Sequence, residues 1–284
     1  MKLALLADIH ANLPALQVVA AHLDAWGPER VVVAGDVVNR GPRPAECLDF
    51  VLDRQRRDGW LLVRGNHEEY VMVHARPGSP RSGPQFEVWQ GSFWTYQKLN
   101  EDVSALEAMP FQVSLSAHDD APDGAPKGDE IRVTHASMLG TRDGIYPRTP
   151  DDELSQKIGL PTPALFGVGH THIPLVRSLN GTLVVNTGAV GLPFDGDVRA
   201  SYAQATWRGG AWHAGIVRLD YDRARAERDF YETGFLDEAP GFAHLVQVEL
   251  RTARSRVYEW LRAYEARVLA GELTMQASVR EFIG

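Results

Sequence analysis

The sequence predicts an α/β fold in which buried strands alternate with helices. Short apolar runs each end in glycine or a polar residue, which is typical of buried strands. Between the first two runs, apolar residues recur at helical spacing, and Pro14 stands near the start of that helix. A strand, a helix and a strand in succession indicate a β-α-β unit, and a further helix near 45–56 extends the pattern.

Each element follows from its own local pattern. The first strand is predicted over 3–7, and the helix after it is marked by Leu16, Val19, Ala20 and Leu23. Further apolar runs predict the strands 31–34, 60–63, 131–134 and 164–168. Asn180-Gly181 between two apolar runs predicts a β-hairpin. Strand-like runs then follow over 182–185, 201–207 and 212–219, and a helical segment is expected from about 243.

The segment from about 75 to 130 is expected to form a cap or insertion within a single domain over 1–284. It begins with a proline- and glycine-rich loop at 76–84, and a polar stretch at 118–129 is predicted to be a hairpin or loop. Between them lies an aromatic cluster, predicted to be helical and to end near Pro110, formed by Trp89, Phe93, Trp94 and Tyr96. Its spacing favours packing on the core, and stacking on a substrate base is the alternative.

Length and composition limit the class of protein. Of the 284 residues, 44% are hydrophobic and 23% are charged, which excludes a wholly disordered chain, a collagen-like repeat and a membrane protein. The formal net charge of −8 predicts no strong binding to nucleic acid. The single cysteine, Cys47, excludes an internal disulfide framework and a cysteine-based zinc cluster. The oligomeric state stays open.

The N-terminal apolar run reads as a strand rather than a targeting signal. It covers only 3–7 and is interrupted by Asp8 and His10, whereas a signal peptide needs roughly 7–15 apolar residues. No other run approaches the roughly 18 apolar residues of a membrane span. We therefore expect a cytoplasmic protein with no membrane partner.

Side chains that can bind metals follow the predicted strands repeatedly. They are Asp8, His10, Asp36, Asn66, His67, His135, His170 and His172. In an α/β sheet the carboxyl ends of the strands gather at one edge, where ligand sites form. Imidazole and carboxylate groups suit divalent ions such as Mn, Fe, Ni and Zn. Because this set exceeds the need of one tetrahedral ion, it fits two ions that share a carboxylate.

Five blocks within this set resemble the calcineurin-like metallophosphoesterase superfamily, and in particular its small bacterial phosphodiesterases. In chain order they are Asp8-Ile9-His10, Gly35-Asp36, Gly65-Asn66-His67-Glu68, His135 and Gly169-His170-Thr171-His172. The resemblance implies a four-layer α-β-β-α sandwich of two mixed sheets, with a dinuclear metal site at the strand ends.

The resemblance also implies a role for each residue. The implied metal ligands are Asp8, His10 and His172 for one ion, Asn66, His135 and His170 for the other, and Asp36 for both. His67 would be the general acid that protonates the leaving group after a hydroxide between the ions attacks phosphorus. Arg40 and Arg64 are candidates for holding the phosphoryl oxygens, because a guanidinium matches phosphate geometry. Mn²⁺ is the expected ion, with Fe, Ni and Zn as alternatives.

Position 39 departs from one branch of the superfamily. The stretches 35–41 and 64–68 resemble the phosphoprotein phosphatase and symmetrical dinucleoside-tetraphosphatase branch, where an Asp normally stands at the position of Asn39 and orients the catalytic histidine. Asn can accept a hydrogen bond but has no charge to support an imidazolium. The stretches 8–16 and 186–191 look more like the small bacterial phosphodiesterases, which we favour.

We therefore expect a hydrolase that cleaves phosphodiester bonds of small nucleotide-type substrates, such as cyclic nucleotides or dinucleoside polyphosphates. A phosphomonoesterase or a protein Ser/Thr phosphatase is the alternative, and Arg40 and Arg64 support it. A non-catalytic scaffold of the same fold, as in a subunit of the retromer sorting coat that lacks the catalytic histidine, is disfavoured because His67 and every ligand residue are present here.

Overall fold

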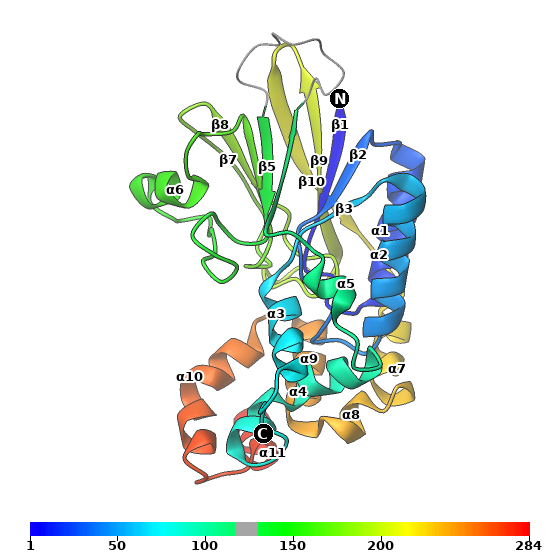
Figure 1. Cartoon of the computed structure of the whole chain (residues 1–284), viewed down its shortest axis with the longest axis vertical. Coiled ribbons are helices and arrows are strands. Elements are labelled where there is room, and N and C mark those ends of the chain that lie inside the picture. Colours follow the sequence, from blue (N-terminus) through cyan, green and yellow to red (C-terminus); the bar gives the residue numbers. More distant parts are fainter. Residues whose placement is uncertain (117–129) are drawn as a thin grey trace.

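The computed structural model describes residues 1–116 and 130–284, and in these residues two five-stranded sheets form the upper part of the molecule as seen in Figure 1. The first sheet has the order β10-β9-β1-β2-β3, with the bounds Ala211–Leu219, Ala200–Arg208, Lys2–Leu6, Arg30–Val33 and Leu61–Leu62. The second has the order β4-β5-β6-β8-β7, with the bounds Gln112–Ser116, Glu130–Thr134, Leu165–Val168, Thr182–Asn186 and Leu175–Leu179. Parallel and antiparallel pairs occur in both, so both sheets are mixed.

Alternation along β1 decides which layer each side chain joins. Leu3 and Leu5 enter the apolar core between the two sheets, whereas Ala4 and Leu6 enter the core on the opposite face. That opposite core lies under α1 and α2, and α6 covers the outer face of the second sheet through Leu154. The bounds of these three helices are Leu13–Trp26, Pro44–Asp58 and Asp151–Ile158. The predicted four-layer α-β-β-α sandwich is thereby confirmed.

The other helices gather toward the end of the sandwich where β1 terminates (Figure 1). From the first half of the chain they are α3 (Asn66–Met72), η1 (Val73–Ala75), α4 (Pro84–Lys98) and α5 (Ser104–Glu107). From the second half they are α7 (Arg223–Glu232), α8 (Phe235–Glu238), α9 (Pro240–Thr252), α10 (Arg256–Leu269) and α11 (Met275–Ile283). The helical region thus begins at Arg223, earlier than expected, because α7 buries only Ala226, Asp229 and Phe230 and has a weak apolar pattern.

One predicted helix end and one predicted hairpin can be compared with the structure. The aromatic helix α4 ends at Lys98 rather than near Pro110, and the short α5 follows it. Asn180 and Gly181 join the antiparallel strands β7 and β8 with φ values of 48° and 86°, as a tight hairpin requires. The hairpin or loop predicted at 118–129 lies outside the described residues. None of the described helices combines the length and the apolar content that crossing a lipid bilayer demands.

Candidate metal centre

Loops at the ends of the strands position the predicted ligands in backbone conformations that are rare for residues other than glycine. Positive φ values of 56°, 48°, 55°, 66° and 58° occur at Asp8, His10, Asp36, His170 and His172. Such residues are uncommon and cluster at functional sites. The loops are also bonded to each other, since the N–H of His10 donates to the carbonyl of Asp36 at 3.0 Å. The backbone therefore fixes where these side chains lie.

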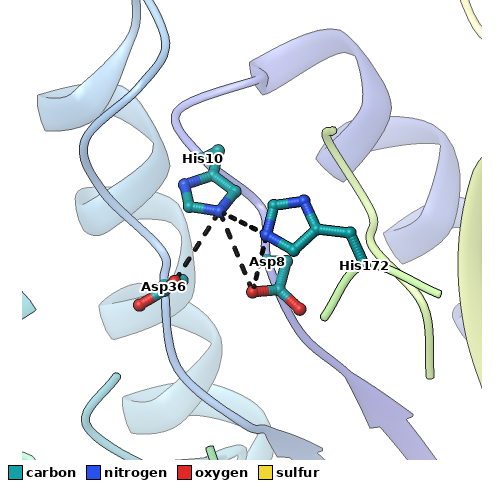
Figure 2. Close-up of side chains that lie close together, drawn as sticks. All are labelled: Asp8, His10, Asp36 and His172. Atoms are coloured by element: carbon teal, nitrogen blue, oxygen red, sulfur yellow. Dashed lines mark hydrogen bonds and ion pairs between the residues drawn. The ribbon is translucent and has the colours of Figure 1, made fainter. Parts of the chain in front are cut away.

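Four side chains form the first ligand group, Asp8, His10, Asp36 and His172 (Figure 2). Nε2 of His10 lies 3.1 Å from Nε2 of His172, which in turn lies 3.3 Å from Oδ1 of Asp8. Nε2 of His10 lies 3.7 Å from Oδ2 of Asp36. One ligand atom from each residue lies within 4.8 Å of the others, so the four can surround a single ion.

The second ligand group contains Asp36, Asn66, His135 and His170. Oδ1 of Asn66 lies 2.8 Å from both Nε2 of His135 and Nδ1 of His170. Nε2 of His135 lies 3.3 Å from Oδ2 of Asp36. Oδ2 of Asp36 therefore faces both groups, which is where a carboxylate shared by two ions has to lie.

The hydrogen bonds on the far side of three histidines direct their Nε2 atoms into the site. Nδ1 of His10, His135 and His172 faces a backbone carbonyl, of Asn39, Ala34 and Leu192 respectively. Because a carbonyl oxygen only accepts, Nδ1 carries the proton, and Nε2 of the neutral ring directs a lone pair into the site.

Two carboxylate atoms in the site also lack partners. Oδ1 of Asp8 and Oδ2 of Asp36 are buried and accept no hydrogen bond within the described part of the chain. Buried acceptors without partners are costly, and a pair of inward lone pairs 3.1 Å apart on His10 and His172 adds to that cost. Divalent cations would satisfy all of these atoms, so the residues fit a metal site.

The pKa shifts of the histidines follow from burial and from Asp36. Burial lowers the pKa of His10 well below 6.5 and that of His170 to about 4, so both are neutral bases near pH 7. Burial also opposes a charge on His135, but the Asp36 carboxylate outweighs it and raises the His135 pKa to about 10. A cation that takes Nε2 of His135 must therefore displace a proton.

Glu68, which sequence reasoning did not select as a site residue, holds the Asp36 loop against α3. The side chain is fully buried, and it accepts hydrogen bonds of 2.8 Å from the N–H groups of Asp36, Val37 and Gly65. Burial raises the pKa of Glu68 to about 7. Its place three residues after Gly65, the N-cap of α3, is the local signal that could have identified it.

His67 stands beside the ligand groups and is held by Asn39. The rings of His67 and His10 are edge-on with centroids 4.8 Å apart. Nδ2 of Asn39 donates to Nδ1 of His67 at 2.9 Å, while Oδ1 of Asn39 accepts the N–H of Arg40 at 2.9 Å. The Arg40 bond fixes the orientation of the amide, so the neutral His67 ring carries its proton on Nε2. Burial is the main reason that the pKa of His67 lies well below 6.5.

A cavity of about 410 Å³ opens beside the second ligand group, and Asn66, His67, His170 and Arg40 are among its lining residues. Arg40 is already paired, because its Nη2 donates to Oε2 of Glu249 at 2.6 Å. Arg64 is not among the lining residues, and its Nε lies 3.9 Å from Oε1 of Glu69. The structure thus brings together the seven predicted ligands, His67 and Arg40, and leaves Arg64 outside the cavity.

The aromatic cluster of α4 divides between core and cavity. Trp94 and Tyr96 are buried, and Phe93 packs on the apolar core under α1 and α2. Trp89 alone of the four lines the cavity. Three of these side chains therefore pack on the core, as their spacing predicted, and only Trp89 is available to a substrate.

An α-β-β-α sandwich with aspartate and histidine side chains clustered at its strand ends defines the class of metal-dependent phosphoesterases. Residues 1–209 match the family model described as the calcineurin-like phosphoesterase superfamily domain, and the chain belongs to that superfamily. It is thus a hydrolase of phosphoric esters from a family that binds divalent metal ions.

The chain is similar to one curated protein and to several solved structures. The chain is 27% identical over 244 residues to the uncharacterized protein MJ0912 of Methanocaldococcus jannaschii, covering 79% of this chain and 89% of that protein. A metallophosphoesterase from Sphaerobacter thermophilus is 26% identical with a TM-score of 0.67, covering 89% of this chain and 100% of that one. The hypothetical protein PH1004 from Pyrococcus horikoshii, 19% identical, shares the fold with a TM-score of 0.69 over 85% of this chain and 97% of its own.

Proposed function

We propose that this protein is a metal-dependent phosphodiesterase of small nucleotide-type substrates, such as cyclic nucleotides or dinucleoside polyphosphates. The observation that carries the proposal is the position of Asp36. Its Oδ2 lies 3.7 Å from Nε2 of His10 and 3.3 Å from Nε2 of His135, so one carboxylate oxygen faces both ligand groups. A shared carboxylate between two ions is the arrangement used for in-line displacement at phosphorus.

Each ligand group would hold one divalent ion. The proposed ligands are Asp8, His10 and His172 for the first, Asn66, His135 and His170 for the second, and Asp36 for both. Two ions bound there would polarise the phosphoryl oxygens and lower the pKa of water toward neutrality. We propose Mn²⁺ as the ion to test first, with Fe, Ni and Zn as alternatives that the same ligand types accept.

The remaining roles belong to side chains at the cavity. His67, once protonated, would give a proton to the oxygen of the departing alcohol and return to the neutral ring that Asn39 holds. Arg40, a lining residue, would face the phosphoryl oxygens. For Arg64 the same role stays a prediction from the sequence. A cytoplasmic location likewise stays a prediction from the sequence.

The proposal is tested by hydrolysis of bis(p-nitrophenyl) phosphate with and without a chelator. We expect activity that the chelator abolishes and Mn²⁺ restores. Activity that resists the chelator, or none with any of the four metals, would contradict the proposal. On a diester with an alkyl leaving group, which needs a proton to depart, His67→Ala should keep its metal ions and slow turnover by about 10²–10⁴-fold, the usual span of general acid–base catalysis. Unchanged turnover in that variant would remove His67 from the chemistry.

A phosphomonoesterase or protein Ser/Thr phosphatase is the second candidate, because Arg40 at the cavity could bind a terminal phosphate. The pairing of Arg40 with Glu249 at 2.6 Å makes the diesterase the stronger proposal. Rates on a phosphopeptide and on the aryl diester, compared under the same metal conditions, distinguish the two. A non-catalytic scaffold is disfavoured because His67 and all seven ligand residues are present.

A further inference from the structure

The cavity beside the second ligand group is built from two parts of the chain that lie far apart in sequence. One wall carries Asn66, His67 and His170 and so belongs to the metal centre. The opposite wall comes from α9 and α10, through residues such as Phe242 and Leu261. Its volume of about 410 Å³ falls in the range of small-molecule binding sites. Because the cavity shares these residues with the metal centre, a molecule bound in it would also reach the metal centre.

One face of α10 is directed at the cavity. Val257, Leu261 and Glu265 recur every fourth residue along this helix, so they share one side of it, and all three line the cavity. Trp260 and Val268 lie on another side and pack against α11. Residues 223–283 lie beyond the part that matches the superfamily model, which ends at 209. The wall opposite the metals is thus supplied by a region outside the matched catalytic part.

The opposite wall is mainly apolar and aromatic. Phe242 and Tyr258 from the C-terminal helices and Trp89 from α4 line the same cavity, together with Val257 and Leu261. Aromatic side chains of this kind stack on planar rings, and base–aromatic stacking contributes about 1–3 kcal/mol per base. A phosphate chain would gain no binding free energy from these apolar and aromatic side chains, whereas a nucleobase would be stabilised by stacking on them.

The charged side chains of the cavity also favour a nucleoside over a second phosphate group. Among the described lining residues, apart from histidines, Arg40 and Glu265 are the charged ones, and Glu249 already neutralises Arg40. Glu265 is half-buried, and its carboxylate has no hydrogen bond or ion pair with any described residue. A carboxylate in that position accepts a hydrogen bond from an amino or hydroxyl group, and it repels a second phosphate.

We propose that the cavity binds the nucleoside part of the substrate, with one phosphoryl group at the metal centre and a hydrogen-bond donor of the base or sugar against Glu265. This inference rests on the proposed function and narrows the range of substrates that it names. Cyclic nucleotides and other esters of a single phosphate fit the cavity, whereas the polyphosphate chain of a dinucleoside polyphosphate would meet Glu265 without a free cation to offset its charge.

The test compares two diesters that share a leaving group. Methyl p-nitrophenyl phosphate lacks a nucleoside, and the p-nitrophenyl ester of adenosine 5′-monophosphate carries one. Leu261→Trp fills the cavity and should lower kcat/KM for the nucleoside ester about tenfold or more, while the methyl ester keeps its rate within about twofold. Leu269→Trp, on the exposed end of the same helix and outside the cavity lining, is the matched control and should change neither rate.

Glu265→Gln supplies a second variant that introduces no bulk. It should lower kcat/KM for the nucleoside ester about tenfold, the effect of one hydrogen bond to a charged group. It should also raise the rate on diadenosine tetraphosphate relative to the nucleoside ester. Equal losses for both p-nitrophenyl esters, or no loss for the nucleoside ester in either variant, would overturn the inference.

The inference and the proposed function fail in different ways. If the wild-type protein hydrolyses neither ester with any metal, the proposed function fails. Calorimetric titration of adenosine 5′-monophosphate into the protein with Mn²⁺ then tests the cavity alone. Binding that Leu261→Trp weakens about tenfold or more and Leu269→Trp does not would support the nucleoside site. Equal binding by all three proteins, or no binding by the wild type, would contradict it.

Discussion

Asn39 directs the nitrogen of its side-chain amide, and not the oxygen, at Nδ1 of His67, with Nδ2 at 2.9 Å. The oxygen is occupied by the N–H of Arg40. Nδ1 of His67 therefore accepts a hydrogen bond, which favours the neutral ring over the imidazolium. Burial is the main reason that the pKa of His67 lies well below 6.5, and the charge of Arg40 lowers it further.

Asn39→Asp should make His67 a stronger proton donor near neutral pH. A carboxylate accepts a hydrogen bond from protonated Nδ1 and stabilises the imidazolium, so the pKa of His67 rises. A general acid works while it is protonated, and its contribution is lost as pH rises through its pKa. We expect kcat on an alkyl ester, whose leaving group needs a proton, to increase about tenfold at pH 7. The pH–rate profile should extend to higher pH, and a profile identical to the wild type would refute this role of Asn39.

Glu249→Ala should destabilise the fold strongly. The Glu249 side chain is fully buried, and its carboxylate accepts from Nη2 of Arg40 at 2.6 Å and from the N–H of Val257 at 2.8 Å. Removing it leaves the Arg40 charge buried without a partner, which costs about 3–5 kcal/mol. Urea denaturation measures the loss. The double variant Arg40→Leu/Glu249→Leu should lose less, because no charge is left unpaired; a larger loss in the double variant would contradict this explanation.

The lowered pKa of His74 predicts that the stability of the fold depends on pH. Burial, helped by Arg81, lowers its folded-state pKa from 6.5 to about 4, and Nε2 is 2.8 Å from Oγ of Ser92. Between pH 6.5 and 4 the unfolded chain binds more protons at this residue, so the free energy of unfolding falls as the pH is lowered through that window. His74→Gln should show a shallower slope there in denaturation experiments. Identical slopes for the two proteins would show that His74 is not responsible.

The clustering of the candidate metal ligands could be predicted from the sequence because each of these residues follows a local strand pattern. The apolar run before Asp8 marks a strand, and the side chain that follows a strand in an α/β fold reaches the sheet edge. Asp36 and His135 follow β2 and β5 in the same way. The strand periodicity that defined the fold therefore also located the site.

Other features depend on contacts that no local pattern encodes. Glu249 and Leu261 belong to helices more than 200 residues after Asp36, and only tertiary packing brings Leu261 to the cavity and Glu249 to Arg40. The amide orientation of Asn39 depends on the N–H of Arg40. Arg64 resembled a phosphate ligand by its place in a block, yet it lies near Glu69 and outside the cavity lining.

Metal stoichiometry of Asp36→Ala tests the central claim most directly. Oδ2 of Asp36 faces both ligand groups, so its loss should weaken both ion sites at once. After loading with Mn²⁺ and dialysis, elemental analysis should find two ions per chain in the wild type and none in Asp36→Ala. Asp53→Ala, which removes an exposed carboxylate on α2, is the control and should keep two. Two ions per chain in Asp36→Ala would contradict a shared carboxylate and the dinuclear centre built on it.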